Sequence, residues 1–213
     1  MYRKVLKRLI DFFVSSASLF ILSPFFLFLW VLVRIKLGNP VLFIHKRPGL
    51  HGNLFNLFKF RTMTNTKDSD GNLLPDKERM TSLGRFLRRN SVDELPQLIN
   101  VLKGDMSLVG PRPLELDYLP YYSEKEKTRH NVRPGMTGLA QVNGRNNIDW
   151  DTKLALDVCY VENLNFSLDI QIIFKTMINI IKRQDISKSG LDSPGRFDVY
   201  RKKQLQKNKQ VIV

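Results

Sequence analysis

Cysteine and histidine are scarce in this chain, and the shortage excludes several classes of protein. Cys159 is the only cysteine among 213 residues, so an intrachain disulfide framework and a cysteine-rich zinc module are both excluded. The three histidines, at positions 45, 51 and 130, lack the spacing of a metal-binding motif. Such cysteine usage is typical of a reducing, cytosol-facing environment. The chain can still form a core, because 43% of its residues are hydrophobic.

Acidic residues are scarce at both ends of the chain, which carries a net charge of +14. Residues 1–61 contain ten Lys or Arg and a single acid, Asp11, whereas residues 62–195 contain eighteen of each sign. Residues 196–213 add six basic residues and one acid. A nucleic-acid-binding domain more often carries its excess on the folded body, so we expect no nucleic acid partner. Basic residues that flank an apolar run favour attraction to anionic membrane lipids.

That apolar run covers residues 12–33, which are 22 residues without a charge. A straight helix of this length would be about 33 Å long and could cross a bilayer. Proline removes a helical hydrogen bond, so Ser23-Pro24 predicts a bend in the middle. Both flanks are basic, which favours keeping both ends in the cytoplasm. We therefore predict a re-entrant, monotopic membrane hairpin over residues 1–37, with a single straight span as the alternative.

The remaining chain predicts a compact, mostly helical α+β domain over residues 38–195, followed by a basic tail over residues 196–213. Two runs rich in β-branched and aromatic residues, 41–47 and 54–61, flank a turn and predict a small β-hairpin. Polar or glycine-rich composition predicts loops over residues 64–77 and 133–147. Helices are predicted over residues 82–89, 91–103, 123–130, 151–162 and from Ser167 onward.

Two of these helices carry further expectations. Ser91 and Glu94 have the spacing of a capping box that would open the helix over residues 91–103, and Gly104 would end it. In the last helix, apolar residues recur three and four positions apart, which predicts a stripe that faces the core, or alternatively the membrane interface. The stripe contains Ile170, Ile173, Phe174, Met177, Ile178 and Ile181.

Asp93 and Glu94 are the first candidates for chemistry. Helix capping would explain both, but Arg88 stands just before them and Arg112 lies in a rigid Pro-Arg-Pro frame downstream. Arginine forks bind phosphate, and a carboxylate beside cations stays ionised. Adjacent helical residues diverge by about 100°. One carboxylate could therefore attack phosphorus while its neighbour holds a divalent cation.

Weaker candidates are scattered along the chain. Asp68 and Asp70 form a DxD, a short metal-binding pattern of many sugar-nucleotide glycosyltransferases, although solvated loop acids are the simpler explanation. Lys59 and Arg145 could reach phosphates, or they could be an exposed strand charge and part of a plain turn. Asp157, among apolar helix neighbours, could pair with an arginine or act as a metal or second-layer carboxylate. Neither a P-loop nor a G-x-G-x-x-G motif is present.

Several motifs in fixed order connect the chain to a known family, and the broken apolar hairpin with Ser23-Pro24 lies among them. On these motifs the chain closely resembles the bacterial sugar transferases, monotopic polyprenyl-phosphate phosphoglycosyl transferases, from about residue 4 to about residue 183. The motifs are Lys7-Arg8-Leu9-Ile10-Asp11, Lys59-Phe60-Arg61-Thr62-Met63, Leu83-Gly84-Arg85-Phe86-Leu87-Arg88, Ser91-Val92-Asp93-Glu94-Leu95-Pro96-Gln97-Leu98, Gly104-Asp105-Met106-Ser107-Leu108-Val109-Gly110-Pro111-Arg112-Pro113, Arg133-Pro134-Gly135 and Gln141-Val142-Asn143-Gly144-Arg145-Asn146.

The resemblance implies an enzyme at the cytoplasmic face of the bacterial inner membrane. Such an enzyme moves a sugar 1-phosphate from a UDP-sugar to undecaprenyl phosphate and releases UMP, the first membrane step of glycoconjugate assembly. The resemblance implies that Asp93 becomes a phosphosugar ester, that Glu94 is associated with Mg²⁺, and that Arg88 and Arg112 bind phosphate. The chain looks most similar to the small protein-glycosylation enzymes that transfer phospho-diacetylbacillosamine.

Two other functions stay open from the residues alone. A membrane-anchored glycosyltransferase that uses Asp68 and Asp70 as metal ligands would release UDP instead of UMP. A non-catalytic basic scaffold would bind membranes without consuming a UDP-sugar.

Overall fold

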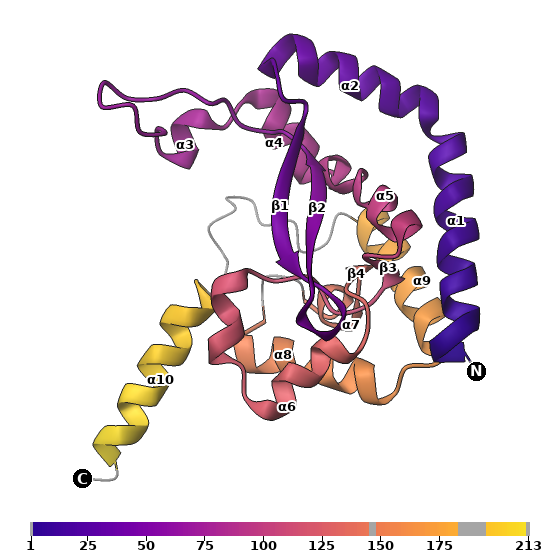
Figure 1. The fold of residues 1–213 in the computed structure, drawn as a ribbon, viewed down its shortest axis with the longest axis vertical. Coiled ribbons are helices and arrows are strands. Elements are labelled where there is room, and N and C mark those ends of the chain that lie inside the picture. The colour runs from indigo at the N-terminus through magenta and orange to yellow at the C-terminus, as the bar shows by residue number, and fades with distance from the viewer. Residues whose placement is uncertain (1, 145–147, 183–194, 212–213) are drawn as a thin grey trace.

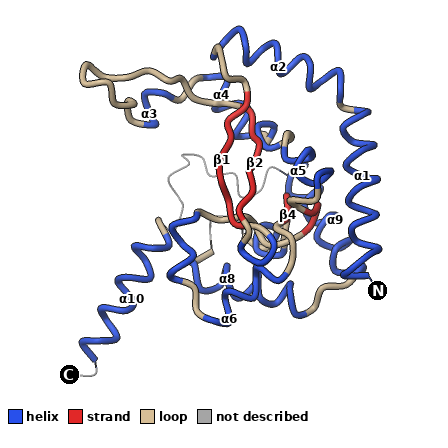
Figure 2. Tube along the Cα trace, in the orientation of Figure 1, coloured by secondary structure: helices blue, strands red, loops and turns tan. Residues whose placement is uncertain are grey.

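The computed structural model describes residues 2–144, 148–182 and 195–211, and it confirms the mostly helical α+β character (Figures 1 and 2). Arg145 lies outside the described residues. The helices are α1 (Lys7–Ile21), α2 (Ser23–Leu37), α3 (Asp76–Arg79), α4 (Ser82–Arg89), α5 (Gln97–Lys103), α6 (Glu124–Lys127), α7 (Leu139–Val142), α8 (Trp150–Glu162), α9 (Phe166–Lys182) and α10 (Phe197–Val211). The strands are β1 (Leu42–Pro48), β2 (Leu54–Phe60), β3 (Ser107–Val109) and β4 (Gly135–Thr137).

The predicted hairpin is confirmed, whereas a second sheet was not foreseen. β1 pairs with β2 in antiparallel register, with Leu42 opposite Phe60. β3 pairs with β4 in parallel, and this pairing corrects the prediction that residues 133–147 form only a loop. Strands of three residues are too short to show the alternation of polar and apolar residues that marks a longer strand. The short helix α7 also falls inside the segment predicted as a loop.

The predicted bend in the apolar segment is confirmed. α1 ends at Ile21, α2 begins at Ser23, and the two helices are bent by 64°. The Ser23 hydroxyl donates a hydrogen bond to the carbonyl of Phe20 at 2.8 Å, and Pro24 falls in the first turn of α2, where its missing N–H costs no helical hydrogen bond. In the described part of the chain, only this bent pair, and no single helix, has the length and apolarity to cross a bilayer.

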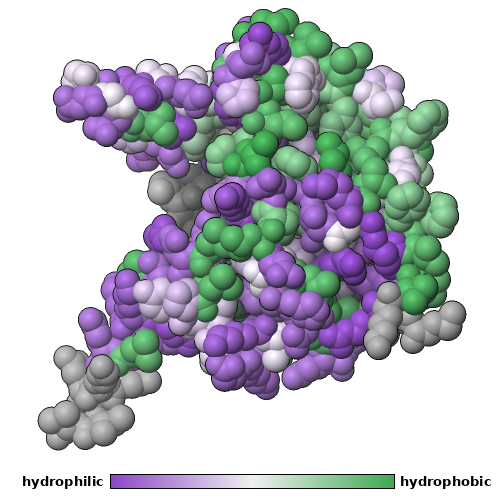
Figure 3. Space-filling view, in the orientation of Figure 1, coloured by the Kyte–Doolittle hydropathy of each residue, from purple (hydrophilic) through white to green (hydrophobic). Residues whose placement is uncertain are grey.

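The α1 helix buries its polar side and exposes its apolar side. Lys7, Asp11 and Ser15, four residues apart, are its buried residues. Lys7 forms an ion pair with Asp169 of α9 at 2.6 Å, and Asp11 accepts a hydrogen bond from the backbone N–H of Leu108 at 3.0 Å. Figure 3 shows the apolar surface along the edge formed by α1 and α2. This arrangement is the reverse of an amphipathic helix on a soluble protein.

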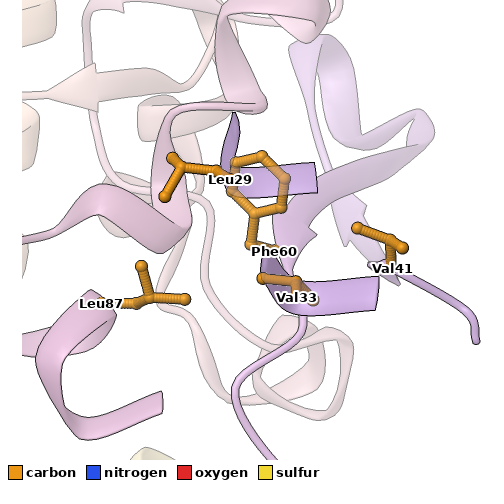
Figure 4. Packing of buried hydrophobic residues seen from close by; sticks show 5 residues of the cluster. All are labelled: Leu29, Val33, Val41, Phe60 and Leu87. Carbon is orange, nitrogen blue, oxygen red and sulfur yellow. The ribbon is translucent and has the colours of Figure 1, made fainter. Parts of the chain in front are cut away.

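The α2 helix supplies part of the core of the domain that follows it. Five buried side chains from α2, the hairpin and α4 pack together (Figure 4). Val92 and Leu95, which flank the Asp93-Glu94 pair, pack against the same cluster. The candidate site therefore lies next to the junction between the bent helix pair and the domain. The five residues are Leu29, Val33, Val41, Phe60 and Leu87.

The apolar stripe of α9 lies differently from the favoured expectation. Ile173 packs against the core around the buried Ile172, and Ile178 is half-buried, but the other four stripe members point outward. The prediction of a core-facing stripe is wrong for the exposed members of the stripe, because α9 is apolar on two sides and only one side meets the domain. The helix begins at Phe166, one residue before the predicted start at Ser167, and the Asn165 side chain accepts from the backbone N–H of Leu168 at 2.9 Å. The exposed stripe members are Ile170, Phe174, Met177 and Ile181.

The α10 helix begins inside an aromatic cluster and then runs away from the body (Figure 1). Phe197 is fully buried and stacks on Tyr122, with Tyr118 and Trp150 packed around it. The basic tail predicted over residues 196–213 therefore starts as an anchored helix.

Candidate active site

The Asp93-Glu94 pair does not cap a helix. Residues 92–94 form a single 3-10 turn, and α5 begins only at Gln97, after Pro96. Ser91 has a left-handed backbone (φ 54°), and its side chain caps no described N–H. The predicted capping box at Ser91 and Glu94 is therefore wrong, because the Glu94 carboxylate binds distant cations instead. The predicted helix end is confirmed at Gly104, which has a φ of 91°.

The Glu94 carboxylate is held by two cations. Lys59 Nζ lies 2.7 Å from Glu94 Oε1, and Arg112 donates to both oxygens, at 2.6 Å and 3.2 Å. Burial acts to raise the pKa of Glu94, but Arg112 and Lys59 outweigh it and hold the pKa well below its usual range. Glu94 is therefore a permanently charged anchor for two cations.

The pKa of the neighbouring Asp93 carboxyl is shifted in the opposite direction. Its residue is only 7% exposed, and burial raises the pKa of its carboxyl, with the charge of Glu94 adding to the rise. Lys59, Arg88 and Arg112 act to lower this pKa without fully compensating. The expectation that nearby cations would dominate at Asp93 is thus corrected, since desolvation and a like charge weigh more. The same contributions place three cations within electrostatic reach of the buried carboxyl.

Arg88 reaches the site from the last turn of α4. Its Nε donates to the Thr62 hydroxyl at 3.0 Å, while the side chain remains exposed and has no carboxylate partner within 4.0 Å in the described residues. α4 approaches Thr62 very closely: a Cβ at Gly84 would lie 1.8 Å from the Thr62 carbonyl oxygen. Glycine at this position therefore allows the contact that positions Arg88.

Arg112 follows β3 and lies beside the parallel pairing of β3 with β4. The Pro111 carbonyl accepts from the backbone N–H of Gly135 at 3.0 Å. The Arg112 carbonyl accepts from Arg129 Nη2 at 2.7 Å, and the same guanidinium pairs with Asp157 at 2.8 Å. Of the alternatives for Asp157, the contact favours pairing with an arginine, in a position that supports Arg112.

Three buried polar side chains that hold the site were missed from the sequence. Thr62 positions Arg88, and Arg129 positions the Arg112 backbone. Asn100 is fully buried; it accepts from the backbone N–H of Phe58 at 3.0 Å and donates to the Asn56 carbonyl at 2.7 Å. These bonds tie β2, which carries Lys59, to α5. Thr62 stands inside a quoted motif, but Asn100 and Arg129 have no local sequence signal.

The DxD loop is arranged for its own folding. Asp68 Oδ1 accepts from the backbone N–H of Asp70 at 3.0 Å and from that of Asn72 at 2.8 Å. The segment between β2 and α3 projects away from the body (Figure 1). Across the described residues, no group of three or more His, Cys, Asp or Glu side chains is arranged to hold a metal ion. These contacts favour the solvated-loop explanation for Asp68 and Asp70.

Comparison with known proteins places this geometry in a family. The model for "bacterial sugar transferase" matches residues 2–183. A protein of Bacillus subtilis named uncharacterized sugar transferase EpsL is 52% identical over 193 residues, covering 91% of this chain and 96% of that protein. An undecaprenyl-phosphate galactose phosphotransferase of Salmonella typhimurium is 42% identical, covering 84% of this chain but 41% of its own length. A UDP-glucose:undecaprenyl-phosphate glucose-1-phosphate transferase of Klebsiella pneumoniae is 39% identical, covering 81% and 39%. The chain therefore belongs to the bacterial sugar transferase family.

Proposed function

We propose that this protein is a phosphoglycosyl transferase that moves a sugar 1-phosphate from a UDP-sugar to undecaprenyl phosphate. The observation that carries the proposal is the buried Asp93 carboxyl beside Glu94, with Lys59, Arg88 and Arg112 around the pair. The names of the Salmonella and Klebsiella relatives supply the acceptor, and the latter also supplies a UDP-sugar donor.

In the first step, an Asp93 oxygen attacks the β-phosphorus of the UDP-sugar. A new oxygen–phosphorus bond forms, the bond to the bridging oxygen breaks, and UMP leaves with that oxygen and its electron pair. The sugar phosphate then remains on Asp93 as an acyl phosphate ester. Only the ionised carboxylate can attack, and partial desolvation makes it a stronger nucleophile than one in water.

In the second step, an oxygen of undecaprenyl phosphate attacks the same phosphorus. The bond to Asp93 breaks, the carboxylate is restored, and the product is a polyprenyl diphosphate sugar. Both steps place negative charge on phosphoryl oxygens, which Arg88 and Arg112 are suited to bind through their guanidinium groups. Glu94 keeps Lys59 and Arg112 in place before the substrate arrives, so little reorganisation is required.

Mg²⁺ is the proposed cofactor. This ion is usually bound through one or two carboxylates together with substrate phosphate oxygens, so a full protein cage is not needed. Lys59 and Arg112 occupy Glu94 Oε1, whereas Glu94 Oε2 accepts only the longer 3.2 Å contact from Arg112 among the described residues. This oxygen beside Asp93 would hold the ion, and the residues present therefore fit it. When bound, Mg²⁺ would neutralise charge on the phosphates.

A monotopic position on the cytoplasmic membrane face completes the proposal. Three observations support it: the 64° bend, the outward apolar side of α1, and the exposed apolar face of α9. The site lies beside the junction of α2 with the domain, where the phosphate of a membrane lipid could reach Asp93. Protease protection of the N-terminus in oriented vesicles would test this, since a hairpin leaves it on the cytoplasmic side.

Mass spectrometry of the intact chain tests the chemistry directly. The protein is incubated without lipid with UDP-glucose, UDP-galactose or UDP-diacetylbacillosamine, and the released nucleotide is identified. The expected result is a phosphosugar adduct on Asp93 together with UMP for one donor. Release of UDP without an adduct would instead support the glycosyltransferase alternative, although the contacts of Asp68 do not favour it.

A further inference from the structure

A cavity of about 320 Å³ lies at the base of α1, outside the proposed active site. It is bordered by the first residues of the chain, the tip of the β1–β2 hairpin and the start of β3. None of Asp93, Glu94, Lys59, Arg88 and Arg112 lines it. Its volume falls in the range of small-molecule sites, which is about 300–1,000 Å³.

Three arginines in the lining have no ion-pair partner among the described residues, and Asp11 is the one carboxyl that lines the cavity with them. Arg3, Arg8 and Arg133 have no carboxylate within 4.0 Å in the described residues, whereas the Lys7 charge is matched by Asp169. Carbonyl contacts orient the guanidinium groups without neutralising them. The contacts are Arg3 to Asn131 at 3.3 Å, Arg8 to Val101 at 2.6 Å and Leu102 at 2.7 Å, and Arg133 to Gly104 at 2.8 Å.

A buried hydroxyl in the lining lacks a partner. Ser107 is 1% exposed, and its hydroxyl is close enough to the Asp11 carboxyl to act to lower the pKa of that group, but it meets no described residue in ordinary hydrogen-bond geometry. Buried polar side chains without a partner are rare and call for an explanation. A ligand oxygen in the cavity would accept from this hydroxyl in better geometry than the Asp11 carboxyl does.

We propose that this cavity binds a phosphate group. Guanidinium groups match phosphate oxygens in geometry and charge, and a serine hydroxyl can donate to the same oxygens. A phospholipid headgroup and free phosphate share this chemistry. Next to the cavity, Val5 in the turn before α1 and Leu9 and Phe13 on α1 are exposed, so acyl chains of a lipid bound there could follow this apolar side. The site goes beyond the proposed function, because the transfer steps do not use it.

Two measurements on the full chain test the proposal. Native mass spectrometry after reconstitution in nanodiscs counts retained phosphatidylglycerol, and thermal unfolding in detergent reports stabilisation by inorganic phosphate. The test variant combines Arg3→Gln with Ser107→Ala, which leaves the α5 carbonyl contacts in place. Arg34→Gln is the matched control, because Arg34 is an exposed arginine on the same helix pair outside the cavity. Phosphate measurements are repeated in an Arg88→Gln background to remove binding at the proposed active site.

The expected result is about a tenfold loss of lipid adducts, of phosphate affinity, or of both in the test variant, with the control unchanged. Loss of lipid adducts alone identifies a headgroup, and loss of phosphate stabilisation alone identifies a soluble phosphate. Equal adducts and equal phosphate response in the test variant and the parent would overturn the proposal. Turnover of the test variant with solubilised substrates should stay within about twofold of the parent. A negative result for phosphate binding in the cavity would therefore not contradict the proposed function of the active site.

Discussion

Two clusters of charged residues in this protein are built from similar side chains and differ in solvent access. In one, Arg129 and Asp157 pair at 2.8 Å with side chains only 2% and 3% exposed. In the other, Glu94 faces Lys59 and Arg112, whose side chains are 23% and 42% exposed, and Arg88 stands nearby. The closed pair has one charge of each sign, whereas the open cluster has more cations than its anchoring carboxylate needs.

The difference separates a structural ion pair from a site that can bind an anion. In a closed pair each charge is neutralised by the other. Neither side chain can turn toward a ligand without leaving an unpaired buried charge. An open cluster with surplus cations can direct them to incoming phosphates while Glu94 keeps its hold on their side chains. Excess positive charge with solvent access, and not burial alone, therefore marks the proposed active site.

The largest expected effect is at the proposed nucleophile. Asp93→Asn should lower UMP release by about a thousandfold or more, because the amide cannot form the phosphosugar ester. The folded state raises the pKa of Asp93, so its ionised form destabilises the protein at neutral pH. The variant should therefore unfold at the same or a higher temperature than the parent. Substantial residual turnover would remove Asp93 from the mechanism.

The closed pair should respond through stability first. Arg129→Met leaves Asp157 buried and unpaired, which should cost about 3–5 kcal/mol of unfolding free energy, measured by denaturant titration. Adding Asp157→Leu should recover most of the stability. If Arg129 also positions Arg112, turnover in the double variant should remain about tenfold low. Full recovery of turnover would make the pair purely structural.

Replacing an arginine of the open cluster by lysine should lower the activity. Arg112→Lys keeps the charge but loses the two-point contact with Glu94, so kcat/KM should fall by about 10- to 100-fold with little change in stability. Arg89→Lys is the matched control, since Arg89 is exposed on the same helix as Arg88. Equal activity of the Arg112→Lys variant and the parent would argue against guanidinium recognition of phosphate.

The pH dependence should report the raised pKa of Asp93. Activity requires the ionised form, so it should fall as pH drops, with the acid limb of kcat/KM above the usual aspartate value of about 3.9. The pKa of Glu94 is held below its usual range, so Glu94 should not contribute in this window. Lys59→Met removes a cation that lowers the pKa of Asp93 and should move the limb to higher pH. A shift to lower pH would contradict this electrostatic arrangement.

The smallest effect is expected in the loop between β2 and α3. Asp70→Asn leaves both backbone contacts of Asp68 in place, so turnover should change by less than about twofold. The assay should be run over a range of Mg²⁺ concentrations. A loss of activity that added Mg²⁺ restores would instead support the hypothesis of a DxD glycosyltransferase.

Local features of this fold could be predicted from the sequence, because their causes lie within a few residues. Pro24 marks the bend, the turn between residues 47 and 54 marks the hairpin, and Gly104 ends α5. The candidate carboxylates and Arg88 could also be selected from the sequence as a hypothesis, since they stand close together in the chain.

Long-range contacts account for what the sequence could not provide. The Ser91–Glu94 spacing fits a capping box, but Glu94 meets Lys59 and Arg112, which lie 35 and 18 residues away. Arg129 gave no local signal, because its role depends on Asp157 from another helix. The direction of α9 depended on which of its two apolar sides met the domain.

The packing of α2 has a consequence for attempts to shorten the protein. Leu29 and Val33 fill the space between Phe60 and Leu87, and Arg8 of α1 binds the carbonyls that end α5. Deleting the first 37 residues to shorten the chain would remove the side chains packed beneath the turn that carries Asp93. The carbonyls at the C-terminal end of α5 would also lose their hydrogen bonds from Arg8. The bent helix pair and the turn that carries Asp93 therefore depend on shared packing, and a chain without residues 1–37 should lose the position of that carboxyl.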